Sequence, residues 1–315
     1  MNAFRKRLLA VVAAATVGLG TIGSAHADAF ASAVLDINNF RLLHASGAAY
    51  ATADFRTLTG TNDAHATASL NGVFAADSRS LPILSGTQPD VPQQCVGAPC
   101  PPIGENNFTP FAAPPPVPGN FGYADQRLVG SSITINGTPA GARAQTRAQA
   151  STNTNMQTAS GDSDVGSSTT FQFTLGESDT MTVSFDATPY AAAFISEEAG
   201  PTSNANARMS WAINIVDLTT GASVFQFAPA DINGRAIVSR TDGDTGLPQY
   251  NRDMETFSFL ATTPLLNAGT MYQITVQQST LANALQQEEV PEPATLAIVA
   301  AGLLSMSLTL RRRQS

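Results

Sequence analysis

Apolar and polar residues alternate with a period of two along most of the chain after residue 170. Phe171, Phe173 and Leu175 alternate with polar residues, and the same pattern recurs in segments 181–185, 205–215, 224–227, 257–261 and 271–278. A period of two gives a strand one apolar and one polar face. Turn residues such as Gly176, Thr220-Gly221 and Ala268-Gly269 separate these segments. Short strands bounded by turns predict a sandwich or barrel.

Segment 142–157, ARAQTRAQASTNTNMQ, alternates in the same way but with small residues. Its even positions are Ala, Thr or Met, and its odd positions are Arg, Gln, Ser or Asn. This pattern predicts one long strand. Alanine also leads the helix-propensity ranking, so a helix remains the alternative.

Earlier segments are less uniform. Segments 35–43 and 65–74 are predicted strands, and Asn136-Gly137 after an apolar run predicts a hairpin turn. Segment 44–64 is rich in Ala and Thr and fits neither strand nor helix clearly. The resulting fold prediction is mainly β, with an antiparallel β-sandwich or jelly-roll-like body over residues 28–287.

Segment 81–118 interrupts the body with 11 of the 19 prolines. Proline cannot donate to a β-ladder, so we predict a long, solvated surface loop or linker. The segment contains both cysteines of the chain, Cys95 and Cys100. In an exported protein this spacing predicts a small loop closed by a disulfide.

Charge is distributed unevenly along the chain. Residues 28–287 contain ten arginines, no lysine and 21 acidic residues, a net charge of −11. This charge repels phosphate backbones and argues against nucleic-acid binding. Divalent cations or neutral polysaccharide are the favoured partners.

Residues 1–27 have the three regions of a secretory signal peptide. A basic start at Arg5-Lys6-Arg7 precedes an apolar run, and Ala25 and Ala27 form an A-x-A cleavage site before Asp28. We predict that the mature chain begins at Asp28.

The C-terminal end, residues 288–315, has three parts in order. Val290-Pro291-Glu292-Pro293 is followed by an apolar run of 17 residues, 294–310, and then by Arg311, Arg312 and Arg313. The run is just long enough for a single transmembrane helix, and the arginines predict a cytoplasmic end.

These three parts resemble the PEP-CTERM sorting signal of Gram-negative bacteria. The resemblance implies that an exosortase, a membrane transpeptidase-like protease, recognises Pro291, Glu292 and Pro293 and cleaves nearby. It also implies localisation to the cell envelope, cell surface or extracellular matrix, in association with exopolysaccharide and biofilm. The two prolines favour an extended, accessible peptide, as a protease requires.

Acidic pairs are the candidate chemical groups of the body. Asp162 and Asp164, and likewise Asp242 and Asp244, offer oxygen ligands for calcium, although ordinary Asp/Gly turns are the favoured interpretation. Glu197-Glu198 is a candidate acid/base pair for glycoside hydrolysis.

We predict a protein without enzymatic activity or a required cofactor, with a structural or adhesive role at the cell surface. The alternatives are a calcium-dependent, lectin-like module for exopolysaccharide and, less favoured, a polysaccharide hydrolase.

Overall fold

The computed structural model describes residues 28–85, 88–110, 119–165 and 170–286, which form fifteen strands and three short 3₁₀ helices. The helices are η1 (Thr52–Asp54), η2 (Ala230–Ile232) and η3 (Arg240–Asp242). The strands are β1 (Ala29–Leu43), β2 (Phe55–Leu70), β3 (Val73–Pro82), β4 (Gln94–Ala98), β5 (Asn120–Val129), β6 (Ala142–Thr152), β7 (Gln157–Val165), β8 (Thr170–Leu175), β9 (Thr182–Ile195), β10 (Asn204–Asp217), β11 (Ser223–Phe227), β12 (Arg235–Ser239), β13 (Gln249–Tyr250), β14 (Phe257–Thr262) and β15 (Met271–Gln286).

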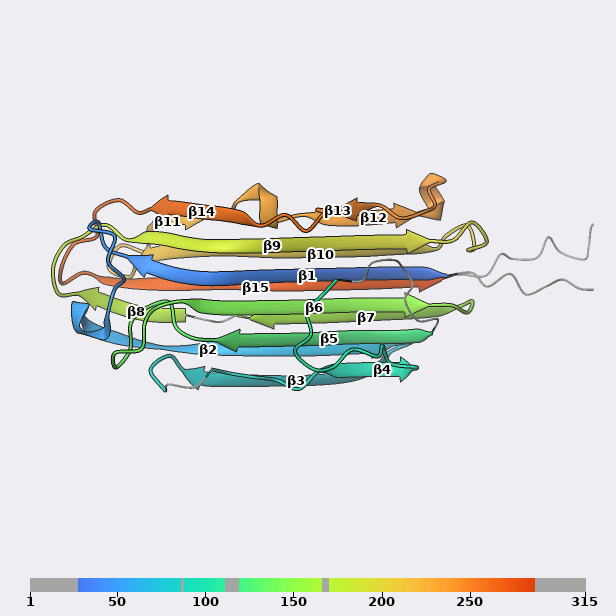
Figure 1. Ribbon diagram of the computed structural model, residues 1–315, viewed down its shortest axis with the longest axis horizontal. Helices are drawn as coiled ribbons and strands as arrows, with labels where there is room; N and C mark the ends of the chain where they lie inside the picture. The colour runs from blue at the N-terminus through green and yellow to red at the C-terminus, as the bar shows by residue number, and fades with distance from the viewer. Residues whose placement is uncertain (1–27, 86–87, 111–118, 166–169, 287–315) are drawn as a thin grey trace, which may run out of the picture.

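The strands form two antiparallel sheets that pack face to face, with their strands along the long axis of the molecule (Figure 1). The first sheet has the order β13-β9-β1-β6-β5-β4, with β14 also paired to β9. The second has the order β11-β10-β15-β7-β2-β3, with β12 beside β10 and β8 beside β15 and β2. The mainly β, antiparallel sandwich predicted from the period-two pattern is confirmed.

The space between the sheets is filled differently along its length. At one end, the first sheet contributes mainly alanines. Ala31 of β1, for example, has Ala150 of β6 and Ala193 of β9 as its neighbours within the sheet. At the other, Phe40, Phe185 and Trp211 form an aromatic cluster, with 4.5 Å between the Phe185 and Trp211 ring centroids. The core is therefore thin where alanine dominates and thick where the aromatic rings gather.

Two glycines lie where the backbones of the two sheets approach each other. A Cβ on Gly161 of β7 would collide with the Tyr123 carbonyl of the first sheet, and a Cβ on Gly122 of β5 would collide with backbone atoms of Ser69 and Ser160. Neither glycine has a positive φ. Both positions therefore require glycine because of packing and not because of backbone conformation.

The alternation in segment 142–157 correctly predicted a strand but placed the end of that strand too late in the sequence. β6 is a strand, so the helical alternative is wrong, but the strand ends at Thr152. Residues 153–156 turn the chain into β7, and Met156 has a φ of 59° in this turn. Within the unassigned segment 44–64, residues 52–54 are η1 and residue 55 begins β2.

The Pro-rich segment 81–118 departs from its prediction as a solvated loop or linker. Gln94–Ala98 forms strand β4 on the edge of β5, although the ladder was expected to fail there. Val91 is 1% exposed and packs between the sheets against Ala64, Ala66 and Ala124. A disulfide joins Cys95 of this strand to Cys100, two residues after the strand ends. The prolines lie mostly outside the paired residues, so the edge ladder tolerates them.

The first and last described strands begin and end at the same end of the sandwich (Figure 1). Ala29 pairs with Thr152 at the end of β6, and Gln286 pairs with Gln157 at the start of β7. The two chain ends therefore flank the β6–β7 turn. Among the described residues no helix is long and apolar enough to cross a membrane, and the predicted span 294–310 lies outside them.

Candidate functional site

Several predicted site residues lie outside the described part of the chain. These are the signal-peptidase residues Ala25 and Ala27, the sorting residues Pro291, Glu292 and Pro293, and the arginines Arg311, Arg312 and Arg313. The remaining candidates lie within the two sheets and their connections.

Asp162 and Asp164 lie two residues apart on the outer face of β7. Asp164 is opposite His65 of β2, and both carboxylates are half-buried. Burial raises the pKa of Asp164 to about 6, and the neighbouring Asp162 charge adds to this shift. Burial also raises the pKa of Asp162. The two strand positions place these carboxylates side by side, but on a flat sheet surface and not in a turn.

The other acidic pairs lie in exposed connections. Asp242 ends η3, and Asp244 follows it after Gly243, whose φ is 84°. Glu197 and Glu198 are exposed in the turn between β9 and β10. Within the described ranges, no three His, Cys, Asp or Glu side chains gather in a group that could hold a metal ion. Residues 242–244 form an Asp/Gly turn.

A polar cluster that sequence reasoning missed lies on the outer face of the first sheet. The guanidinium of Arg147, fully buried on β6, donates from Nη1 to the carbonyl oxygens of Asn107 at 2.7 Å and Thr109 at 3.0 Å. Asp125 of β5, also fully buried, accepts a 2.7 Å hydrogen bond from the Asn106 backbone N–H. Residues 106–109 are therefore held across the sheet by this cluster, which we call the cover contact.

The cover contact also includes apolar packing, and burial shifts the pKa values of its two charged side chains. Phe108 packs on Val34 and Tyr190 of the sheet below. Burial raises the pKa of Asp125 to about 6, although the hydrogen bonds from Asn106 and Tyr123 favour its charged form. Burial also lowers the pKa of Arg147 to about 10. The odd positions of segment 142–157 predicted a polar face, but periodicity contains no information on what covers that face.

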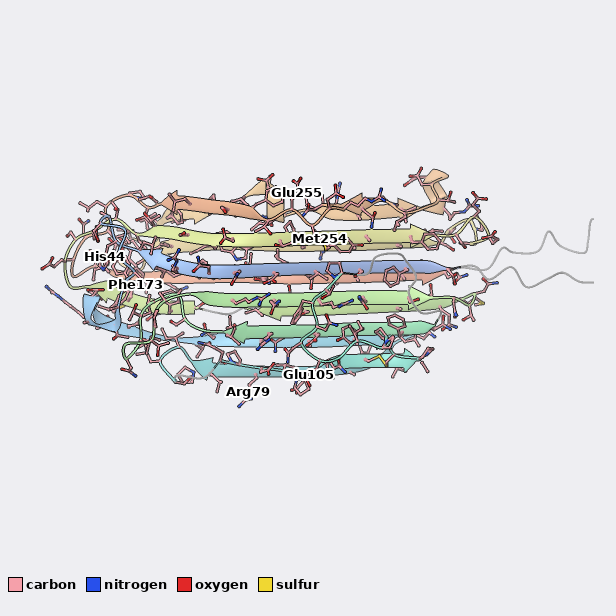
Figure 2. All side chains as sticks on the ribbon, viewed as in Figure 1. His44, Arg79, Glu105, Phe173, Met254 and Glu255 are labelled. Atoms are coloured by element: carbon pink, nitrogen blue, oxygen red, sulfur yellow. A yellow bond between two sulfur atoms is a disulfide. The ribbon has the colours of Figure 1, made fainter. Side chains whose placement is uncertain are left out.

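A second polar cluster lies at the end of the sandwich opposite the chain ends, where Figure 2 shows His44. The two ring nitrogens of His44 lie 2.7 Å from Asp179 Oδ2 and 3.0 Å from Asp54 Oδ2. The ring stacks on Tyr50, with 3.7 Å between the centroids. This arrangement joins the end of β1, the residues just before β2 and the loop before β9.

The His44 cluster predicts a pH-dependent stability. Burial lowers the pKa of His44, but the hydrogen bonds and charges of Asp179 and Asp54 outweigh it, so the folded pKa lies above the ordinary value of 6.5. The stabilisation is therefore fully present below that value and is lost as the pH rises through the folded pKa.

This expectation is checked by thermal unfolding of the wild type and of His44→Gln between pH 6 and about pH 8.5. The wild type should lose its advantage over the variant as the pH rises, and a His44 ring pKa above 6.5 should be measured by NMR. A difference in Tm that does not change with pH contradicts the assignment.

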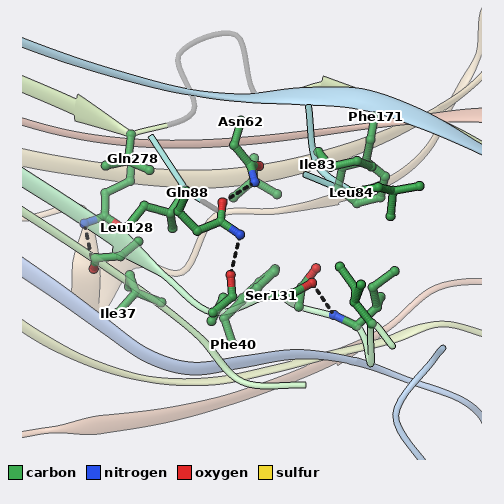
Figure 3. Close-up of a pocket in the computed structure, with 18 of the residues that line it drawn as sticks. Ile37, Phe40, Asn62, Ile83, Leu84, Gln88, Leu128, Ser131, Phe171 and Gln278 are labelled. Atoms are coloured by element: carbon green, nitrogen blue, oxygen red, sulfur yellow. Dashed lines mark hydrogen bonds between the residues drawn. The ribbon is translucent and has the colours of Figure 1, made fainter. Parts of the chain in front are cut away.

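A pocket opens between the sheets beside the aromatic cluster (Figure 3). It lies where β4 covers only residues 120–124 of β5, so the rest of that edge is left without a neighbouring strand. Figure 3 shows Ile37, Phe40, Leu128 and Phe171 among its apolar walls, and Gln88 and Asn62 at one side. Asn62 donates to Gln88 at 2.6 Å, and Gln88 donates to the Gly130 carbonyl oxygen at 2.6 Å. The pocket has the composition of a ligand site, with mostly apolar walls and a few polar groups.

The comparisons with known proteins identify the C-terminal signal. A family model for the PEP-CTERM protein-sorting motif matches residues 289–313. No curated protein and no solved structure matches the chain. The motif implies an exported surface protein that depends on exosortase, a membrane protease, with a cell-surface or extracellular location in Gram-negative bacteria. The chain is a PEP-CTERM sorting domain-containing protein.

Proposed function

We propose that the protein is a non-enzymatic structural or adhesive component of the cell surface or extracellular matrix, associated with exopolysaccharide. The observation that carries this proposal is the position of the chain ends. Gln286 ends β15 next to the β6–β7 turn, and the sorting motif begins at residue 289. A body attached or processed at that end presents its faces and its opposite end to the surroundings.

The outer face of the second sheet supports an adhesive role. Neutral polar side chains of neighbouring strands lie across it in register, with Ser160 of β7 opposite Asn283 of β15 and hydrogen-bonded to the buried Ser69 hydroxyl of β2. Ser210 of β10 is opposite Ser279 of β15. Hydroxyl and amide groups in rows can exchange hydrogen bonds with a neutral, hydroxyl-rich polysaccharide. The charge of −11 on residues 28–287 disfavours anionic partners.

Deletion and complementation in the native host test this proposal. Deleting the gene should weaken the cohesion of the biofilm matrix, and the wild-type gene should restore it. A Glu197→Gln, Glu198→Gln variant should restore it equally, because no acid catalysis is required. A deletion strain with an unchanged matrix contradicts the structural role, and failure of the variant alone favours a hydrolase.

Cosedimentation of the mature protein with polysaccharide from the same host separates the structural role from the calcium-dependent alternative. We expect binding that is equal with and without calcium. Binding that requires calcium, and that is lost in Asp162→Asn, Asp164→Asn, favours a lectin-like module instead.

A further inference from the structure

We propose that the pocket between the two sheets binds a small, neutral, mainly apolar molecule that carries one hydrogen-bond donor, such as an alcohol. This is a binding function beyond the structural role at the surface.

The walls of the pocket come from both sheets and from the segment after β3. Ile37 and Phe40 of β1 and Leu128 of β5 belong to the first sheet, and Phe171 of β8 and Trp211 of β10 belong to the second. These five residues belong to paired strands, so this part of the apolar surface is held in place before any ligand arrives. A preformed apolar cavity gains binding free energy from each apolar group that enters it.

Gln278 supplies the polar group that orients a ligand. Its side chain is 2% exposed and lines the pocket (Figure 3). Its Nε2 donates to the carbonyl oxygens of Leu35 at 3.0 Å and Ala144 at 3.2 Å, and to the hydroxyl of Thr146 at 3.2 Å. Its Oε1 is buried without a hydrogen-bond partner among the described residues. A buried acceptor of this kind favours a ligand that brings a donor.

Three other polar groups of the pocket are already paired with one another. Asn62, Gln88 and the Gly130 carbonyl oxygen are joined to one another by hydrogen bonds. All three residues line the same pocket as Gln278 (Figure 3). A ligand in the pocket therefore contacts mainly apolar walls, and the Gln278 Oε1 atom is an acceptor without a partner among the described residues.

The charge of the pocket selects a neutral ligand. None of the described residues that line it is Asp, Glu, Lys, Arg or His. A carboxylate or ammonium group there would lose its hydration without gaining a charged partner, which is costly. The pocket therefore discriminates against fatty acids and amines of the same size.

The available room limits the size of the ligand. The cavity leaves about 90 Å³ for the centres of water-sized molecules. One water needs roughly 10–15 Å³ by this measure, so this part of the opening fits a ligand of well under a dozen heavy atoms, and a neighbouring hollow of about 160 Å³ shares Gln88 and Ser131 with it. A ring of six carbons with one hydroxyl group matches this room.

Trp211 makes binding directly measurable. It is the only tryptophan of the chain, it lines the pocket, and it is the cross-strand neighbour of Gln278. We would titrate the mature protein with cyclohexanol, cyclohexyl methyl ether and cyclohexanecarboxylate at pH 7 and record tryptophan emission. Cyclohexanol should give a saturable change, and the ether, which lacks the donor, should bind about tenfold more weakly. The carboxylate should show no saturation.

Two variants and a matched control connect that signal to the pocket. Leu128→Phe and, independently, Ala144→Leu place extra atoms in the cavity and should weaken cyclohexanol binding by at least tenfold. Leu260→Phe is the matched control. It is the same leucine-to-phenylalanine change as Leu128→Phe, but Leu260 of β14 is 70% exposed, so the affinity for cyclohexanol should not change. If one of these two variants does not show the native melting transition, the cyclohexanol affinity of the other variant is compared with that of the wild type.

Three outcomes would overturn the proposal. They are no saturable response to cyclohexanol, equal affinity for the alcohol and the carboxylate, and wild-type affinity in a folded filling variant.

Discussion

Gly161→Ala is expected to lower the free energy of unfolding by about 3 kcal/mol, the upper part of the range for overpacked interiors. The new Cβ would collide with the Tyr123 carbonyl oxygen and lie against the Gln149 backbone in the facing sheet. Both obstacles are backbone atoms of paired strands, so neither can move without separating the sheets. Alanine in a strand is otherwise more favourable than glycine, so a destabilising result identifies the clash. Chemical denaturation of the mature protein measures the effect.

Two further substitutions control this experiment. Gly122→Ala approaches the same interface from the opposite sheet, against the backbone of Ser69 and Ser160, and should be similarly destabilising. Gly104→Ala adds a Cβ with nothing within 4 Å and should change stability by no more than about 0.5 kcal/mol. A Gly161→Ala protein with the wild-type denaturation midpoint would show that the sheets are not in this contact.

Arg147→Met is expected to cost about 3 kcal/mol and to loosen the cover contact. The substitution keeps the apolar stem but removes the donors to the Asn107 and Thr109 carbonyl oxygens, and it leaves the buried Asp125 without the cation on the directly opposite residue. The loss combines unpaired buried acceptors with an uncompensated buried carboxylate. Denaturation and limited proteolysis within residues 103–110 measure the two consequences.

Arg127→Met is the matched control for this change. Arg127 lies two residues after Asp125 on the same strand and is exposed. Its loss should change the free energy of unfolding by at most about 0.5 kcal/mol and should not change the rate of proteolysis within residues 103–110. Equal effects of the two arginine substitutions would contradict the assigned role of Arg147.

The local fold was predictable because side-chain alternation is itself a local property. In strands such as β10, where Ala205, Met209 and Trp211 face inward, the alternation of apolar and polar residues is enough to predict one buried face. The sorting motif was predictable for a similar reason, since its parts follow one another within residues 289–313. No long-range contact is needed to read either pattern.

The cover contact and the pocket were not predictable because both depend on contacts between distant residues. Arg147 looks like any polar residue on an alternating strand until residues 106–109 are placed over it. The prolines around β4 suggested solvated chain, but an edge strand needs only one paired side. The pocket arises because β4 is shorter than β5, and a single sequence does not reveal how two strands end relative to each other.

We infer that this acidic β-sandwich is exported and then processed at its C-terminal sorting motif. The decisive experiment is intact-mass analysis of the protein isolated from the surface or medium of its native host. We expect a mass that corresponds to a chain beginning at Asp28 and ending near Pro293. A chain that retains Met1, or one that still extends through Ser315, would contradict it.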